Sequence, residues 1–259
     1  MMRWSDTSGG DVVVNVASRG ALLADLEARL AQGQGFSLAT LNLDHVTKLR
    51  RLPEFREAYQ RQTHVTADGN PIVWFSRLAG QTLSLLPGSE LIEPVVELAV
   101  RHGVPVAFFG ATQPSLEAAA AELQRRYPGL QVAVAIAPPM GFDPAGPDAL
   151  GYINTLGASG AGLCLVALGA PKQEIFAARA SAHLPHMGFM SIGAGLDFIS
   201  GTQVRAPRIV RRFAGEWVWR LASDPRRLAR RYGACIALLP GLLHTALRTR
   251  FDTGGGDMS

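Results

Sequence analysis

Apolar positions fall in short runs between about residue 11 and residue 200, and these runs alternate with longer amphipathic stretches. The runs predict strands at residues 11–16, 36–41, 64–67, 104–109, 130–136, 162–168 and 187–192. The amphipathic stretches predict helices at residues 21–31, 71–78, 91–102, 115–127, 148–158 and 172–183. Because runs such as VPVAFFG and GLCLVALG are continuous, the pattern predicts an α/β fold with a mostly parallel sheet flanked by helices on both faces.

The pattern changes after residue 205. Proline, arginine and tryptophan punctuate short segments that we expect to be helical, such as RAPRIVRRF, GEWVWRLA and DPRRLARRY. An uncharged stretch of 16 residues follows at residues 232–247; at this length, and with Pro240 and Gly241 inside it, it is too short and broken for a transmembrane helix. An amphipathic element at a membrane interface is the better interpretation. We therefore expect an α/β domain over residues 1–204 and a helical, membrane-associating appendage over residues 205–259.

Positive charge is concentrated in this appendage. Residues 205–250 contain eleven arginines, no lysine and two acidic residues, for a local net charge of +9. The whole chain carries +4, so the remainder is near −5. Such a segment is expected to attract an anionic partner, which leaves nucleic acid, an anionic bilayer and a diphosphate open.

The composition narrows the class and the compartment. A hydrophobic fraction of 47% with 18% charged residues indicates a globular protein with a substantial core. The cysteines Cys164 and Cys235 lack the spacing of a zinc site or a disulfide framework, which suits a reducing cytosol. The N-terminus, MMRWSDTSGG, lacks an apolar core, so we expect no secretory signal.

Polar residues at the carboxyl ends of the predicted strands are the first candidates for chemistry. Thr40 and Asn42 point to the same side if their strand persists, and there they can hydrogen-bond a sugar or a phosphate. Asn42 also suits a helix cap for the segment that follows. Asp68, before Gly69, can act as the general base that deprotonates an acceptor hydroxyl, or simply as a turn residue.

Two later strand-to-helix junctions add candidates at the same edge of the sheet, where open α/β folds bind ligands. The turn at residues 169–172 opens a helix whose first amides suit a phosphate, with Gln173 facing the crevice. Ordinary helix-entry chemistry explains the same residues. The run GAGLDF lacks the third glycine of a dinucleotide fingerprint, so Asp197 either contacts a nucleobase or ribose or belongs to a flexible turn.

The appendage offers an arginine cluster. Arg220, Arg227 and Arg230 follow a spacing of seven and then three, and they share one helix face if Pro225 only kinks the chain. Guanidinium groups suit diphosphate oxygens. The apolar residues interleaved with these arginines favour a membrane-surface element over a nucleic-acid contact.

Together these segments resemble the WecG/TagA/CpsF family of glycosyltransferases over roughly residues 36–231. The resemblance is carried, in order, by TLNLDHV, ADG, GSELI, LGAPKQE, GAGLDFISGTQVRAP and GEWVWRLASDPRRLARRY. It implies a Rossmann-like α/β fold with a helical C-terminal appendage, and an inverting, metal-independent enzyme without a cofactor. It further implies transfer of a hexose-type sugar from a UDP-sugar to an undecaprenyl-diphosphate-linked acceptor, in cell-surface polysaccharide synthesis at the inner face of the cell membrane.

Carried over position by position, the resemblance assigns the role of catalytic base to Asp68. No DxD motif that would hold a divalent metal is present in the sequence. The remaining site residues are expected to bind substrates: Thr40, Asn42 and Gln173 around donor and acceptor, Asp197 at the uracil, and Arg220, Arg227 and Arg230 at the lipid diphosphate.

One segment departs from the family pattern. Family members usually carry an acidic-Arg pair shortly before a GSDL-like segment, whereas residues 83–88 read LSLLPG, so the arginine expected near Leu85 is absent. If that arginine normally contacts donor phosphates, this protein binds its donor differently or recruits another cation. A degenerate member of the family is one alternative. The rival from another class is a non-catalytic nucleotide- or nucleic-acid-binding module with a basic tail, which the scarcity of lysine disfavours.

Overall fold

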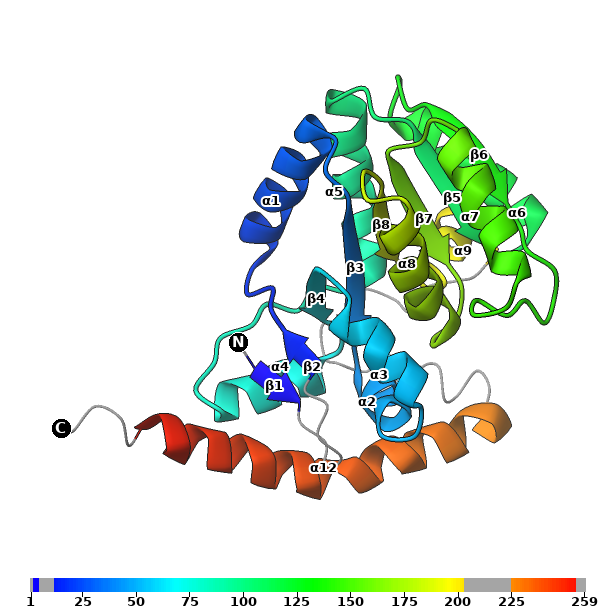
Figure 1. The fold of residues 1–259 in the computed structure, drawn as a ribbon. Coiled ribbons are helices and arrows are strands. Elements are labelled where there is room, and N and C mark those ends of the chain that lie inside the picture. The colour runs from blue at the N-terminus through cyan, green and yellow to red at the C-terminus, as the bar shows by residue number, and fades with distance from the viewer. Residues whose placement is uncertain (1, 5–11, 203–224, 255–259) are drawn as a thin grey trace.

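The centre of the molecule is a six-stranded sheet in which all neighbouring strands are parallel, in the order β4-β3-β8-β7-β5-β6 (Figure 1). The computed structural model describes residues 2–4, 12–202 and 225–254. The strands are β3 (Phe36–Leu41), β4 (His64–Ala67), β5 (Val106–Gly110), β6 (Val132–Ile136), β7 (Leu163–Ala167) and β8 (Gly188–Ser191). The predicted α/β class is confirmed, and β3 and β4 have the predicted bounds.

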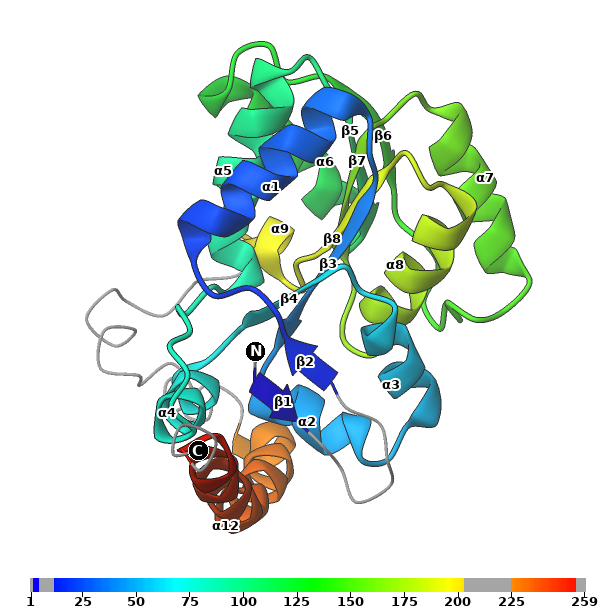
Figure 2. The same cartoon turned by 60° about the vertical axis from the view of Figure 1, so that its left-hand side comes forward.

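Helices cover both faces of this sheet (Figure 2). One face carries α1 (Arg19–Gln32), α5 (Gly88–Arg101), α6 (Gln113–Arg126) and α9 (Gly195–Ile199), and the other carries α3 (Pro53–Gln60), α7 (Asp148–Ala158) and α8 (Lys172–His183). Phe108 and Phe109 are both fully buried, the first in the core under α5 and the second in the core under α8. Because successive strand residues point to opposite faces, both faces need apolar residues, which explains the continuous runs.

The first predicted strand does not join the main sheet. β2 (Val12–Val14) pairs antiparallel with β1 (Met2–Trp4) in a separate two-stranded sheet. The following residue, Asn15, uses its side-chain amide to bond the backbone of Thr63 and Val65 at 2.8 Å each. A side chain therefore covers part of the open edge of β4 where a further strand would otherwise pair.

Two short helices follow β3 in a segment to which the pattern assigned no element. α2 (Leu43–Leu49) is capped by Asn42, whose side chain accepts a hydrogen bond from the His45 amide. α3 begins at Pro53, where the missing N–H is tolerated. Helices of seven and eight residues span about two turns, which is too short for an apolar period to be recognised.

The C-terminal helix α12 (Pro225–Gly254) is one 30-residue helix that runs through Pro240 (Figure 1). The expectation that Pro240 breaks this stretch is therefore wrong. Leu238, Leu242 and Ala246 pack into a core shared with α2 and α4 (Asn70–Leu78), and this burial offsets the roughly 3 kcal/mol that a proline inside a helix costs. The boundary predicted between residues 204 and 205 lies outside the described residues.

None of the helices in the described part of the chain combines the length and apolar character of a membrane-spanning segment.

Candidate active site

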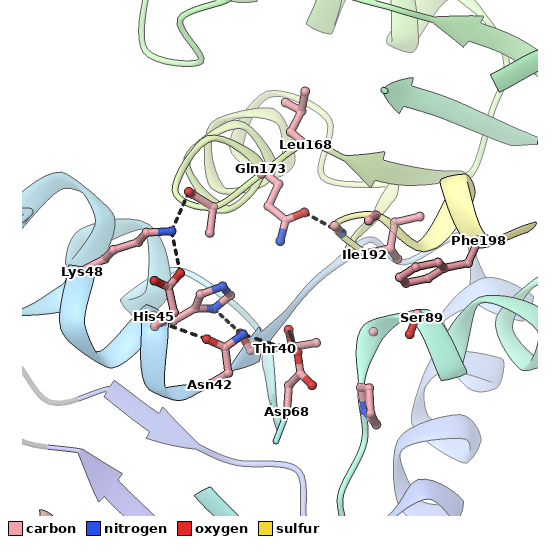
Figure 3. Close-up of a pocket in the computed structure, with 17 residues that line it drawn as sticks. Thr40, Asn42, His45, Lys48, Asp68, Ser89, Leu168, Gln173, Ile192 and Phe198 are labelled. Carbon is pink, nitrogen blue, oxygen red and sulfur yellow. Dashed lines mark hydrogen bonds and ion pairs between the residues drawn. The ribbon is translucent and has the colours of Figure 1, made fainter. Parts of the chain in front are cut away.

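The carboxyl ends of β3, β4, β7 and β8 open into one polar pocket with a volume of about 270 Å³ (Figure 3). Its walls come from the starts of α2, α5 and α8 and from the loop between β8 and α9. This is the edge at which the predicted candidates were expected to meet. The structure brings four of them together as lining residues: Thr40, Asn42, Asp68 and Gln173.

Asp68 lies directly after β4, at the bottom of the pocket as drawn in Figure 3. Its backbone amide donates to Leu41 O at 2.8 Å, which holds the ends of β3 and β4 together. The Thr40 hydroxyl and the Asn42 amide both donate to Asp68 Oδ2, each at 3.5 Å. At that length both bonds are weak, so they orient the carboxylate while a substrate hydroxyl can still compete for it.

The orientation of the Asn42 side chain follows from its two hydrogen bonds, one to the start of α2 and one to Asp68. Its Oδ1 accepts from the backbone amide of His45 at 3.0 Å, and a backbone N–H can only donate. The Nδ2 group must therefore face Asp68, as the structure shows. The two roles that the sequence left open for Asn42, helix cap and pocket residue, are both filled by one side chain.

A buried layer beneath the pocket fixes Thr40. The Thr40 carbonyl oxygen lies 2.8 Å from His45 Nδ1 and 2.5 Å from the Tyr59 hydroxyl. His45 Nδ1 and the Tyr59 hydroxyl are 2.7 Å apart. Burial raises the pKa of Tyr59 well above its ordinary value, so this phenol stays protonated and acts as a donor. The polar edge of β3 is thus supported from behind by α2 and α3.

Gln173 forms the opposite wall through a second buried chain of hydrogen bonds. Its Oε1 accepts from the Gly193 amide at 2.8 Å, and its Nε2 donates to Glu174 Oε1 at 2.8 Å. Since the Gly193 N–H requires an acceptor, Oε1 of Gln173 must face Gly193, which leaves Nε2 to face Glu174. Gln173 therefore connects the start of α8 to the loop after β8.

Glu174 is fully buried behind Gln173. Burial raises the pKa of its carboxyl from 4.5 to about 7, while the hydrogen bond from Gln173 and the charge of Lys48 act in the opposite direction. A carboxyl with that pKa changes its charge near neutral pH, directly behind a pocket residue. The sequence pattern predicts only a helix-entry acid at this position, because burial is not visible in a linear motif.

Two glycines shape the backbone beside the pocket. Gly69 follows Asp68 with φ of 100°, a backbone conformation open almost only to glycine, and so turns the chain into α4. Gly88 begins α5, and a Cβ there would lie 3.0 Å from Ser191 O and 3.3 Å from the Thr40 methyl group. Only a residue without a side chain lets the start of α5 approach β3 and β8 this closely.

Lys48 occupies the rim between α2 and α8, and sequence reasoning missed it (Figure 3). Its Nζ donates to Ala170 O at 2.9 Å and lies 2.7 Å from Asp44 Oδ2. The signal that would have found it is the Asp44–Lys48 pair, four residues apart just after the capping residue Asn42. The apolar pattern predicts no helix there, so the sequence alone does not indicate that the two side chains meet.

The remaining predicted site residues lie elsewhere. Asp197 is outside the pocket lining, in α9, where its Oδ1 accepts from the Ser115 hydroxyl at 2.7 Å; its neighbour Phe198 lines the pocket instead. Leu85, where an arginine was expected, pairs with Ala67 beside β4, and its side chain does not line the pocket. The position of Leu85 in the fold does not explain why a leucine stands where an arginine was expected.

The three appendage arginines are not placed by the structure. Arg220 lies outside the described residues, and of Arg227 and Arg230 only the helical backbone is described. Within residues 2–4, 12–202 and 225–254, no three His, Cys, Asp or Glu side chains gather as possible metal ligands.

Comparison with known proteins gives the site a context. The sequence is similar to the N-acetylglucosaminyldiphosphoundecaprenol N-acetyl-beta-D-mannosaminyltransferase of Bacillus spizizenii, with 27% identity over 203 residues. That alignment covers 78% of this chain and 76% of the Bacillus protein. Residues 9–254, nearly the whole chain, match the Glycosyl transferase WecG/TagA/CpsF family. The predicted resemblance is confirmed: this chain belongs to the WecG/TagA/CpsF family of glycosyl transferases.

Proposed function

We propose that this protein transfers a hexose-type sugar from a UDP-sugar to a polyprenyl-diphosphate-linked saccharide during cell-surface glycan synthesis. The observation that carries the proposal is the Asp68 carboxylate, held in a polar pocket at the carboxyl edge of the sheet of a glycosyl transferase. The name of the Bacillus relative describes transfer to a sugar on diphosphoundecaprenol, which supports the same class of acceptor here.

The proposed reaction inverts the anomeric configuration in one step. An acceptor hydroxyl oxygen forms the new bond to the anomeric carbon while its proton passes to Asp68. The bond from that carbon to the diphosphate oxygen breaks, and its electron pair leaves with UDP. One carboxylate opposite the leaving group meets this requirement, and positive groups and amides at the rim can stabilise the charge that develops on the diphosphate.

Helix α12 is proposed to hold the enzyme at the inner face of the membrane. Its outer side carries three exposed apolar residues, Ile236, Leu243 and Leu247, at a spacing of seven and four, which places them in one stripe. The exposed Arg248 lies next to this stripe. An apolar stripe flanked by arginine is typical of a helix that lies in the plane of an anionic bilayer. This peripheral location would bring the pocket close to a lipid-linked acceptor.

The test is a donor screen with purified protein. UDP-glucose, UDP-ManNAc, UDP-ManNAc uronate and UDP-glucuronate are each supplied with short-chain lipid-diphosphate saccharides, and released UDP is measured. We expect UDP release that depends on both substrates, and a product whose anomeric configuration by NMR is opposite to that of the donor. Retention of configuration would contradict the single-base mechanism, and no release with any pair would contradict the proposed function.

A further inference from the structure

The charges around the pocket are unbalanced for the proposed donor. Among the lining residues, all of which belong to the described part of the chain, there are two carboxylates, Asp44 and Asp68, and one lysine or arginine, Lys48. A nucleoside diphosphate brings further negative charge into this space. Binding it beside two carboxylates requires a cation or a set of amide donors.

Lys48 can supply this cation. Its side chain is 29% exposed, its Nζ donates a hydrogen bond to Ala170 O, and it forms an ion pair with Asp44 Oδ2. An ammonium group has three N–H donors, so the hydrogen bond to Ala170 O and the ion pair hold its position while N–H donors remain for a ligand. Ala170 lies two residues before the first residue of α8, so the cation and the positive end of this 12-residue helix share one wall of the pocket.

The choice of lysine is itself informative. Of the 25 lysine and arginine residues in the chain, Lys48 and Lys172 are the only lysines, and all the others are arginines. Both contact loops at the carboxyl edge of the sheet, since Lys172 Nζ donates to Phe142 O at 2.6 Å. Lysine provides a compact point charge with rotatable donors, whereas the planar fork of arginine fits phosphate in fewer orientations.

We propose that Lys48 is the residue that binds the diphosphate of the nucleotide donor. The inference rests on the proposed function and adds a specific diphosphate contact to it. It also supplies the cation that the missing arginine near Leu85 leaves unassigned. In the reaction, Lys48 would stabilise the negative charge that builds up on the departing diphosphate.

A purely structural role for the pair makes a different prediction. If Lys48 and Asp44 only fasten α2 to the start of α8, then removing either partner should disturb the pocket in the same direction. If Lys48 binds phosphate, removing its charge should weaken diphosphate binding. Removing the Asp44 charge should leave that binding unchanged or tighten it, because a competing anion is gone. If Lys48 binds phosphate, only the Lys48 variants weaken diphosphate binding; if the pair is only structural, the variants of both residues weaken it.

The experiment measures binding of UDP and of uridine by calorimetry to wild type, Lys48→Met, Lys48→Gln and Asp44→Asn, with thermal melts of each. Because hydrogen bonds to charged groups contribute about 1.5–3 kcal/mol, we expect both Lys48 variants to weaken UDP binding roughly 10- to 100-fold. Uridine binding should not change. Lys48→Arg should keep most of the UDP affinity, and Arg51→Met, an exposed position just after α2, should keep all of it.

UDP binding by Lys48→Gln and Lys48→Met equal to that of wild type would overturn the inference, as would equal losses in the Lys48 and Asp44 variants. Wild type that binds UDP no more tightly than uridine would overturn it as well. Steady-state kinetics separates the donor from the acceptor: a Lys48 variant should raise KM for the donor, and a rise confined to the acceptor contradicts the assignment. Failure of the proposed function is read separately, from UDP release by wild type.

Discussion

Helix α2 joins two regions that are held together by different interactions. On its pocket side, His45 bonds the Thr40 carbonyl in β3, and Lys48 donates to Ala170 O in the loop before α8 while it forms an ion pair with Asp44 of the same helix. On its other side, Val46 and Leu49 pack against α12 in an apolar core. The structure of the pocket therefore depends on directional hydrogen bonds, in which each donor has a particular acceptor. The packing of α12 depends on the apolar area that it buries, so it tolerates changes in side-chain shape better.

This contrast predicts that polar substitutions in the pocket act on chemistry and that apolar substitutions along α12 act on stability or on membrane binding. The coupling between the two regions passes through α2, a helix of seven residues. A deletion of the whole appendage would expose the core around Leu49 and so test both regions at once. Single substitutions on the two sides of α12 separate them.

The largest effect is expected from Asp68→Asn. The amide keeps the shape and the contacts to Thr40 and Asn42 but cannot take a proton, so turnover should fall by about 10²–10⁴-fold or more. UDP affinity and the melting temperature should stay close to those of wild type. The measurement is kcat from UDP release, with Asp148→Asn on the exposed start of α7 as the matched control. Turnover near the wild-type rate would remove Asp68 from the role of base.

Of the two regions, the sequence predicted the pocket, whose residues follow from local sequence patterns. Strand ends, turn residues and the positions of Thr40, Asn42, Asp68 and Gln173 follow from apolar runs and from the geometry of parallel sheets. It did not predict Lys48 or the helix that carries it, because α2 is defined by tertiary packing. Nor did it predict that α12 continues through Pro240, since only the core shared with α2 and α4 offsets the proline.

The next effect concerns stability. Leu242→Ala removes a side chain that is 6% exposed and lies in the core with α2, so the free energy of unfolding should fall by about 2–5 kcal/mol. Leu243→Ala, one residue further along and 43% exposed, should change it by less than about 0.5 kcal/mol. Urea unfolding of both variants is the measurement. Equal losses would mean that the buried side of α12 has been assigned wrongly.

Glu174→Gln tests the polar side of the comparison through pH. The folded-state pKa of Glu174 is raised from 4.5 to about 7, so the folded chain keeps a proton that the unfolded chain releases between these values. The free energy of unfolding of the wild type should therefore fall as pH rises through this window. Above it, the folded wild type bears the full penalty of an ionised, buried Glu174. At about 1.4 kcal/mol per pKa unit, the variant should gain on the order of 3 kcal/mol relative to wild type between about pH 4.5 and pH 8.

The measurement is urea unfolding of wild type and Glu174→Gln across that pH range. The glutamine keeps an oxygen that accepts from Gln173, so the loss common to all pH values should be small. Glu122→Gln on the half-buried side of α6 is a useful contrast. The hydrogen bonds from Arg125 and Arg126 hold the pKa of Glu122 at about 2, so that variant should lose stability relative to wild type as pH rises from about 2 to 4.5. Parallel pH curves for wild type and Glu174→Gln would show that the buried carboxyl does not titrate in this range.

The smallest effect is expected at the outer stripe of α12. Ile236 is 59% exposed, and a bilayer would bury most of what water now contacts. Since full burial of such a side chain contributes about 1.5–3 kcal/mol, Ile236→Ala should weaken binding to anionic vesicles by roughly tenfold and leave kcat with a short-chain acceptor unchanged. Flotation with phosphatidylglycerol vesicles measures it, and Ala237→Ser, next to the stripe, is the control. Ile236→Ala that binds vesicles like wild type would assign membrane contact to another surface and leave α12 as a structural support for α2.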